Sequence, residues 1–367
     1  MKVKHIIYTL LFVLLLTGCE KEEVIINKES LRTVLVYMAA DNSLGSSTFD
    51  KQNINSMLNG ATEASLNGGN LIVYKDSPDT IPQLIQITPT GKKLLREYPE
   101  HQNSVSVATM QEVISEVKQE FPADSYGLIL WSHGSNWFPS KMQTRAFGQD
   151  KTNWMELSDL QQALPDNGFD FIIFDACYMA GVEVMYAMKN KADYIIAAPT
   201  EIMGSGFPYS DIIQPLFADK TDYQSICNNF YSYYVDSSTP YATISLIATQ
   251  ELDQLATATR NIMKTSFDKT KEISLNDLQR YFRPPYYGMY DFDDYISRIA
   301  PDDLYAQYRT AMDNTVIYKK HTDSFLPGYN GYYITHYSGL SSFILRDSYG
   351  AVNKEYAKLD WYKAVYE

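Results

Sequence analysis

The sequence predicts an α/β protein built on a mostly parallel sheet with helices on both faces. Between residues 31 and 198, short apolar runs of strand length alternate with segments whose apolar residues recur at helical spacing. Two of those runs end abruptly in polar side chains, as strands do where a site is built at the edge of a sheet. A chain of 367 residues is long enough for a large core, and no internal repeat or linker divides it.

The first half of the chain carries the clearest alternation. We expect strands at residues 31–38, 70–74, 81–88, 93–98, 125–131, 171–174 and 193–198. We expect helices from about residue 47 to 67, and at 105–120, 155–164 and 181–190. The polar stretch 135–153 lacks periodicity and is expected to be a surface loop. Beyond residue 200 the pattern is weaker, with strands at 243–248, 332–336 and 340–345 and helices at 250–264, 274–280 and 294–300.

The N-terminus has the features of an export signal. A basic start at Lys2 and Lys4 precedes an apolar run, residues 6–16, that is too short to span a bilayer as a mature helix. The following Leu16-Thr17-Gly18-Cys19 resembles the bacterial lipobox. We therefore expect a signal peptide at 1–18, lipidation of Cys19, a tether at 19–30, and an exported bacterial lipoprotein at the outer membrane or cell surface.

Charge and composition limit the partners. The formal charge of −13 falls to −15 once the two leader lysines are removed, which argues against nucleic acid and anionic membrane surfaces and favours a basic substrate. The thirty tyrosines are compatible with a glycan- or peptide-binding surface, but also with ordinary residues at the edge of a core.

Two cysteines remain after lipidation of Cys19, namely Cys177 and Cys227. So few thiols do not predict a disulfide-stabilised fold, although a bridge between these two stays open. Cys227 lies on a helical pattern and is expected in the core. Cys177 follows the apolar run 171–174 and precedes a helix, so it lies at a strand-to-helix turn where ligands bind in α/β sheets. The alternative is an inert buried thiol.

A nucleophilic thiol needs a base, and His133 is the best placed histidine. It follows the apolar run 125–131 just as Cys177 follows its own run. If the two strands are neighbours, about 4.8 Å apart in a parallel sheet, both side chains face one cleft. Gly134 allows close approach of a substrate, and its N–H with that of Cys177 could stabilise an oxyanion. The alternative is a solvent-facing histidine beside a turn glycine.

Several motifs together resemble the clostripain family of cysteine peptidases, which shares a clan with caspases, gingipains and legumains. They are, in order, residues 33–44 (TVLVYMAADNSL), 131–134 (WSHG), 175–179 (DACYM), 243–248 (TISLIA) and 338–342 (SGLSS). The resemblance covers roughly residues 31–345. It implies a caspase-like αβα sandwich formed by residues 31–367 as one domain, with 31–200 as the core sheet and 201–367 as its extension. It also implies a His133–Cys177 dyad and endopeptidase action after Arg or Lys.

The resemblance assigns the basic-residue specificity to Asp175, two positions before the thiol. A carboxylate there would pair with Arg bidentately or with Lys as a point charge, and Ser132 is expected to help bind substrate. The alternative for Asp175 is a cap on the following turn. A second pocket acid is expected at Glu201 or Asp211, and the sequence does not choose between them.

The resemblance further implies self-cleavage between the dyad residues, for which Lys141, Arg145 and Lys151 are candidates; an uncut loop is equally compatible with the sequence. Calcium dependence is known in the family, so the resemblance leaves structural calcium open, while the chemistry itself needs no cofactor. We expect a monomer acting on peptide or protein. The competing hypothesis is a non-catalytic surface lipoprotein that binds peptide or glycan through the aromatic segment 281–287.

Overall fold

The computed structural model describes residues 30–100, 102–138, 147–236, 240–283 and 288–367. Within these ranges the dominant feature is one nine-stranded sheet with the order β12-β10-β9-β8-β5-β1-β2-β3-β4. Its central strands run parallel: β1 (Ser30–Ala39), β2 (Asn70–Ser77), β5 (Ala123–Trp131), β8 (Phe169–Asp175) and β9 (Ala192–Ala197). Antiparallel strands extend it at both edges: β3 (Thr80–Thr88), β4 (Gly91–Glu97), β10 (Thr243–Ala248) and β12 (Val316–His321).

Helices cover both faces of the sheet, because its strands are apolar on both sides. Along β1, Val34 and Val36 pack into one core, whereas Leu35 and Tyr37 pack into the other. The first core lies under α2 (Phe49–Gly60), α3 (Glu63–Leu66), α7 (Tyr209–Leu216) and α8 (Tyr223–Val235). The second lies under α4 (Val107–Glu120), α5 (Leu157–Ala163), α6 (Val182–Met188), α9 (Leu252–Glu272), α10 (Phe292–Ser297), α11 (Asp302–Thr315), α12 (Gly350–Tyr356) and α13 (Asp360–Tyr366). The predicted fold class is confirmed.

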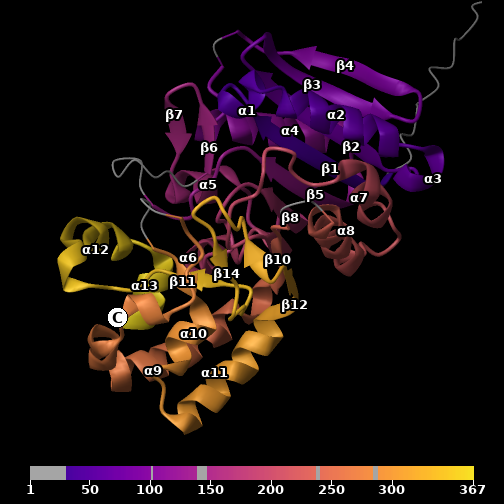
Figure 1. The fold of residues 1–367 in the computed structure, drawn as a ribbon. Helices are drawn as coiled ribbons and strands as arrows, with labels where there is room; N and C mark the ends of the chain where they lie inside the picture. The colour runs from indigo at the N-terminus through magenta and orange to yellow at the C-terminus, as the bar shows by residue number, and fades with distance from the viewer. Residues whose placement is uncertain (1–29, 101, 139–146, 237–239, 284–287) are drawn as a thin grey trace, which may run out of the picture.

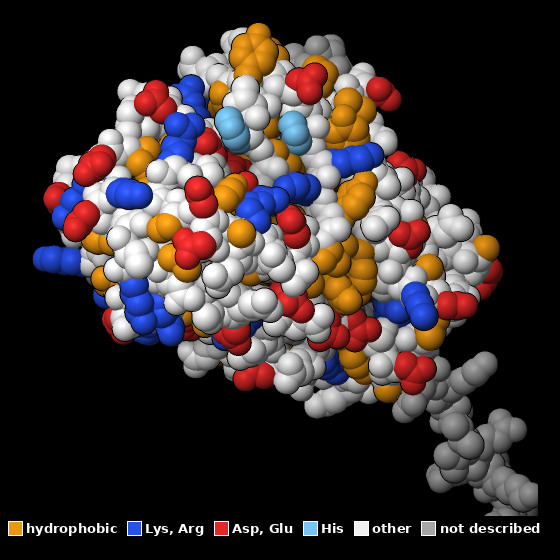
Figure 2. Space-filling model, turned by 90° about the horizontal axis from the view of Figure 1, so that it is seen from below, with side chains coloured by type: hydrophobic (Ala, Val, Ile, Leu, Met, Phe, Trp, Pro, Cys, Tyr) orange, Lys and Arg blue, Asp and Glu red, His pale blue; other side chains and the backbone are white. Residues whose placement is uncertain are grey.

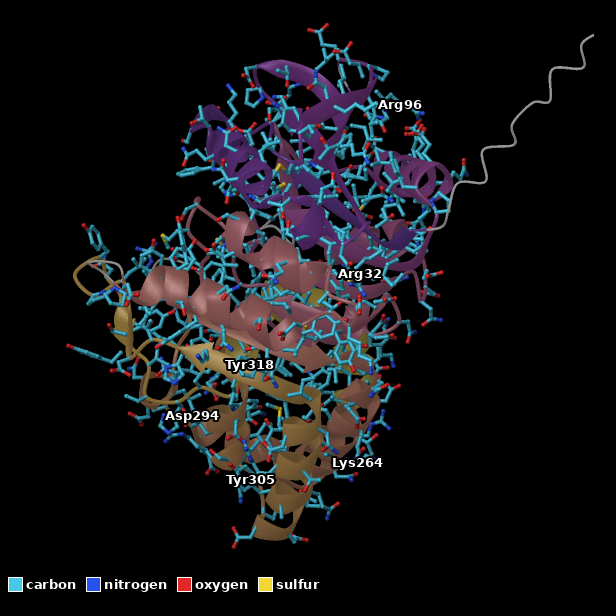
Figure 3. All side chains as sticks on the ribbon, turned by 90° about the vertical axis from the view of Figure 1, so that its right-hand side faces the viewer. Arg32, Arg96, Lys264, Asp294, Tyr305 and Tyr318 are labelled. Carbon is cyan, nitrogen blue, oxygen red and sulfur yellow. The ribbon has the colours of Figure 1, made fainter. Side chains whose placement is uncertain are left out.

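The chain runs from one end of this sandwich to the other. Figure 1 shows the N-terminal strands and α2 at the top and the later helices α9, α10 and α11 at the bottom. Figure 3 shows the same separation, with Arg96 of β4 far from Tyr305 of α11. Arg32 on β1 lies between them, buried, and its guanidinium donates to the Leu216 and Ala218 carbonyls over 2.9 and 2.8 Å. That contact fixes α7 to the first strand of the sheet.

The last hundred residues pack back against the turn that follows β8. The short strand β15 (Ser341–Ser342) forms a parallel bridge to Gly181, and Ser341 N–H donates to the Ala180 carbonyl over 2.9 Å. The remaining short elements are α1 (Ser43–Ser46), β6 (Phe147–Asp150), β7 (Asn153–Met155), β11 (Tyr290–Asp291), β13 (Ser324–Phe325), β14 (Tyr332–Tyr333) and 3₁₀ turns at Thr249–Glu251, Leu275–Asp277 and Asp347–Tyr349.

The sequence-based assignment fails mainly where tertiary contacts, not local pattern, decide. The stretch 135–153 is not all loop, because β6 pairs with the start of β7 in a hairpin. The strands expected at 332–336 and 340–345 shrink to two residues each, and the helix expected at 274–280 is a single 3₁₀ turn. The aromatic segment 281–287 is described only to residue 283; there Tyr281 is buried, and its hydroxyl lies 2.7 Å from Asp291 Oδ2.

Further observations concern the two cysteines, the N-terminus and the surface charge. Cys177 and Cys227 are both free, so they form no bridge. The leader, Cys19 and most of the tether lie outside the described residues, and in the described part no helix is both long and apolar enough to cross a membrane. Figure 2 shows acidic and basic side chains interspersed over one face of the molecule.

Candidate active site

The ends of β5 and β8 bring His133 and Cys177 to one cavity. The two strands are parallel neighbours in the register Trp131↔Asp175, so each candidate residue follows its strand by two positions. This confirms the predicted pairing of the strands. The cavity encloses about 120 Å³. It is lined by Leu44, Trp131, Ser132, His133, Asp175, Ala176, Cys177, Ile202, Met203, Gly204 and Gly206.

Cys177 is half-buried and held by one backbone segment. Its Sγ lies 3.4 Å from both the carbonyl oxygen and the amide nitrogen of Ile202, so the thiol can donate to the one and accept from the other. Burial raises the pKa of the Cys177 thiol to about 12. The resting residue is therefore a thiol that needs a base before it can attack.

His133 supplies a neutral imidazole on the other side of the cavity. Its Nε2 lies 2.9 Å from Ser43 Oγ, and its ring is stacked at 6.1 Å from that of Trp154. Burial lowers the pKa of His133, which keeps the ring unprotonated near neutral pH and able to accept a proton. Within the described residues no hydrogen bond joins the imidazole to the thiol.

Gly134 and Ser132 flank His133 with different roles. A Cβ at position 134 would lie 2.6 Å from the Cys177 carbonyl oxygen, so only glycine permits this approach of the two turns. Ser132 lines the cavity, but its hydroxyl donates to the Ala39 carbonyl over 2.6 Å and accepts from the Gln149 N–H over 3.1 Å. That hydroxyl fastens the end of β1 and β6 to the site.

Asp175 is a buried acid at the floor of the cavity. Its Oδ2 accepts hydrogen bonds from the Phe207 N–H over 3.1 Å and the Tyr209 hydroxyl over 2.9 Å. Burial raises the pKa of Asp175 to about 7, and these two neutral donors offset only part of that effect. Gly206 has φ +63°, and a Cβ there would lie 2.6 Å from Oδ2 and crowd the acid. The cavity thus presents a desolvated carboxyl group whose ionisation a cationic ligand would favour.

Neither candidate for the second acid lines this cavity. Glu201 is paired with Arg283, with Nε–Oε1 at 2.9 Å and a second contact between Nη2 and Oε2. Asp211 lies exposed on α7, where its Oδ1 accepts from the Ser210 hydroxyl. The structure therefore brings Asp175 to the site but neither Asp211 nor Glu201. Glu201 is next in the chain to Ile202, which lines the cavity.

The three candidate self-cleavage residues are not equivalent. Lys141 and Arg145 lie outside the described residues. Lys151 is described, and it occupies the turn between β6 and β7 with φ +54°. Its N–H donates to the Asp41 carbonyl over 2.6 Å, and its Nζ lies 3.2 Å from Asp41 Oδ2. Lys151 is thus fixed in a tight turn.

Sequence reasoning missed the residues that support the site. Ser43, which contacts His133, follows β1 at the same edge of the sheet, so the parallel arrangement could have indicated it. Tyr209 is the first residue of α7, and Gly206 lies in the loop before this helix, where the sequence predicts no regular element. The same is true of Met203 and Gly204, which close the cavity.

No cluster of acidic side chains suited to calcium is found among the residues that the structure describes. Calcium needs several oxygen ligands, with carboxylates prominent among them. In the described ranges, no group of three or more His, Cys, Asp or Glu side chains is arranged to hold an ion. We therefore derive no step of the chemistry through calcium.

Comparisons with known proteins identify a family and several related structures. A model of the clostripain family matches residues 36–367. An inactive zymogen of a C11 protease from Parabacteroides distasonis is 39% identical, with a TM-score of 0.84 over 94% of this chain and 100% of that one. A secreted C11 cysteine protease from Bacteroides thetaiotaomicron, bound to an irreversible peptide inhibitor, is 34% identical, with a TM-score of 0.80 over 92% of this chain and 99% of that one.

No curated protein matches the chain in sequence. The family match nevertheless spans far more than half of the chain, and both structural relatives cover nearly all of it. Their caspase-like architecture is the one built here around the ends of β5 and β8. The chain belongs to the clostripain family and is a cysteine peptidase.

Proposed function

We propose that this peptidase is a lipid-anchored endopeptidase that cleaves after Arg or Lys through Cys177 and His133. The observation that carries the proposal is the convergence of a thiol, a neutral imidazole and a buried carboxyl group on one small cavity. Asp175 ends β8, and His133 and Cys177 lie two residues beyond β5 and β8, so two paired strands of the sheet position all three groups.

The chemistry follows from the protonation states. His133 accepts the Cys177 proton, and the sulfur attacks the carbonyl carbon of the scissile peptide bond. The backbone N–H groups of Gly134 and Cys177 are assigned to the oxyanion of the tetrahedral intermediate. The imidazolium then donates its proton to the leaving amine, and the acyl-enzyme thioester remains. Water attacks that thioester while His133 takes one of its protons, which releases the acid and restores the thiol.

Asp175 is assigned to the basic side chain that precedes the scissile bond. A carboxylate at the cavity floor pairs with a guanidinium or an ammonium group, and pairing repays the cost of its burial only when such a cation is present. A neutral side chain in the cavity would leave the acid buried and without a counter-charge. Selection of Arg and Lys over neutral residues therefore follows from the burial of this one group.

Self-activation is assigned to Lys141 or Arg145, in preference to Lys151. A peptide bound to a protease is extended, whereas Lys151 is held in a left-handed turn by Asp41. One structural relative is described as an inactive zymogen, which supports a processing step in the family. A Lys141→Gln, Arg145→Gln double variant should stay whole, whereas Lys151→Gln should be cut as wild type is. Cleavage of the double variant at Lys151 would contradict this choice.

The proposed lipid anchor and cellular location rest on the N-terminal sequence. Leu16-Thr17-Gly18-Cys19 would direct lipidation of Cys19, and the tether 19–30 would separate the catalytic domain from the outer membrane. A relative described as secreted is compatible with export. We propose that the protein acts there as a monomer on peptides or proteins, with no nucleic-acid partner and no cofactor in the chemistry. Structural calcium stays an open proposal.

The deciding experiment compares cleavage of fluorogenic peptides with Arg, Lys or a neutral residue before the scissile bond. Wild type should cleave the Arg and Lys peptides, Cys177→Ala and His133→Ala should lose at least about 10³-fold in kcat, and Cys227→Ala should retain activity because that thiol is buried in the core. Wild type as inert as Cys177→Ala, even after trypsin nicking between residues 139 and 146, would overturn the proposal and favour the non-catalytic alternative.

A further inference from the structure

Four residues form a closed ring of contacts that includes the candidate nucleophile: Cys177, Tyr178, Glu201 and Ile202. Cys177 is followed in the chain by Tyr178, whose hydroxyl donates to Glu201 Oε1 over 2.6 Å. Glu201 is followed by Ile202, whose backbone N and O each lie 3.4 Å from Cys177 Sγ. A displacement of Glu201 therefore reaches the thiol by two routes, through Tyr178 and through Ile202.

Tyr178 is held in a conformation that a tyrosine rarely adopts. Its φ is +64°, in the left-handed region, so the turn after the thiol needs contacts that enforce it. Its N–H donates to the Thr200 carbonyl over 2.8 Å, and its carbonyl accepts from Asn136 Nδ2 over 2.9 Å. The hydroxyl bond to Glu201 is the third tie, and it is the one that a distant segment controls.

That control comes from Arg283, which is far from Cys177 in the sequence. Its guanidinium pairs with both oxygens of Glu201, so the fork geometry fixes the orientation of the carboxylate. Its Nη1 also donates to the Tyr329 carbonyl over 3.0 Å, which ties the pair to the C-terminal part of the chain. The Glu201 side chain is 14% exposed, and both of its oxygens are already paired with Arg283.

The same pair acts on the charge of the nucleophile. Burial is the main cause of the raised pKa of Cys177; the Ile202 N–H opposes it, the charges of Glu201 and Asp175 add to it, and Arg283 opposes it. Without Arg283, a bare carboxylate would lie close to a sulfur that must become negative. The guanidinium therefore both orients Glu201 and offsets its charge.

We propose that Tyr178, Glu201 and Arg283 are a positioning network for Cys177, and that Glu201 is not a substrate-binding acid. The inference rests on the proposed role of Cys177 as nucleophile. Arg283 holds Glu201, Glu201 holds Tyr178 and the Ile202 backbone, and these two hold the thiol toward the cavity.

The test uses the purified protein with Arg283→Gln, Arg283→Lys, Tyr178→Phe and Glu201→Gln. Arg283→Gln should lower kcat for Arg and Lys peptides by about tenfold or more while KM changes by less than about threefold. Arg283→Lys keeps the positive charge but loses the two-point contact of the guanidinium with Glu201, so its kcat should lie between those of wild type and Arg283→Gln. Tyr178→Phe loses only a hydroxyl and should lower kcat in the same way. The control is Arg309→Gln, which breaks the comparably exposed Arg309–Asp293 pair outside the site and should leave kcat unchanged.

A second readout does not depend on cleavage. The rate at which iodoacetamide alkylates Cys177 between about pH 7 and about pH 9, followed by peptide mass spectrometry, should be lower in Arg283→Gln than in wild type and unchanged in Arg309→Gln. Unchanged kcat and unchanged alkylation profiles in all network variants would overturn the inference. So would a Glu201→Gln protein with raised KM for basic peptides and normal kcat, because that result makes Glu201 a substrate ligand. If wild type cleaves nothing, the proposed function fails while the alkylation profiles still decide the network.

Discussion

Two buried acids stand on either side of the turn that carries Cys177, and they differ in what surrounds them. Asp175 ends β8, Glu183 lies in the first turn of α6, and burial raises the pKa of each to about 7. Asp175 opens onto the cavity and accepts two hydrogen bonds. Glu183 is not among the residues that line this cavity, and its Oε1 accepts from the Ser342 hydroxyl, the Phe343 N–H and the Tyr356 hydroxyl.

The comparison shows that a raised pKa does not by itself mark a specificity residue. Burial shifts both carboxyl groups alike, so the shift says only that each acid is desolvated. The space beside Asp175 can admit a cation, whereas Glu183 joins α6 to β15 and α12 inside the core. Glu183 Oε2 has no hydrogen-bond partner among the described residues, which fits a carboxyl group that is protonated in the folded state.

The largest expected effect is on folding, at Glu183. Glu183→Ala removes the acceptor of three buried donors and leaves a cavity, so the free energy of unfolding in urea should fall by about 3 kcal/mol. Asp175→Ala should cost about 1 kcal/mol, because water can enter the cavity and satisfy its former donors. Equal losses in the two variants would remove the distinction between the acids.

The next effect is on activity, at Asp175. Asp175→Asn keeps the shape but removes the charge, so kcat/KM for Arg and Lys peptides should fall about 100-fold, or about 2.7 kcal/mol. Glu183→Gln should stay within a few-fold of wild type at a temperature where both proteins are folded. Fluorogenic assays on the two variants decide this, and a larger loss in Glu183→Gln would reverse the assignment.

A smaller effect is the pH dependence of that activity. Because the pKa of Asp175 is about 7, the acid is mostly protonated below that pH and mostly ionised above it. The value of kcat/KM for a lysine peptide should therefore rise about tenfold between about pH 6 and about pH 8. Asp175→Asn should lose this limb of the profile, while Glu183→Gln should keep it.

The smallest effect is the pH dependence of stability. For Glu183 the folded pKa is about 7 and lies above the ordinary value, so the folded state holds its proton more tightly than the unfolded chain does. Its contribution to stability is complete at low pH and is lost as pH rises through 7. Urea titrations of Glu183→Gln should show a flatter decline between about pH 5 and about pH 7 than wild type. A steeper decline in the variant would contradict the sign.

The sequence located the candidate dyad because local pattern sufficed there. The runs 125–131 and 171–174 are apolar enough to be buried strands, and parallel strands place the residues that follow them at one edge. The same reasoning does not identify a second acid, since Glu201 and Asp211 both flank one loop and local pattern does not distinguish them. Only the fold shows that Arg283 pairs with Glu201 and that Asp211 is exposed to solvent.

By itself, the sequence determined the α/β class, the strand ends that carry His133 and Cys177, and the resemblance that leads to the family. Tertiary structure alone decided which acids meet which partners: Tyr209 with Asp175, Arg283 with Glu201, and the C-terminal Ser342 with Glu183. The physical reason is the separation along the chain of the residues that interact. Strand and helix patterns reflect neighbours along the chain, whereas the environment of a buried charge is set by groups that folding brings from far away in sequence.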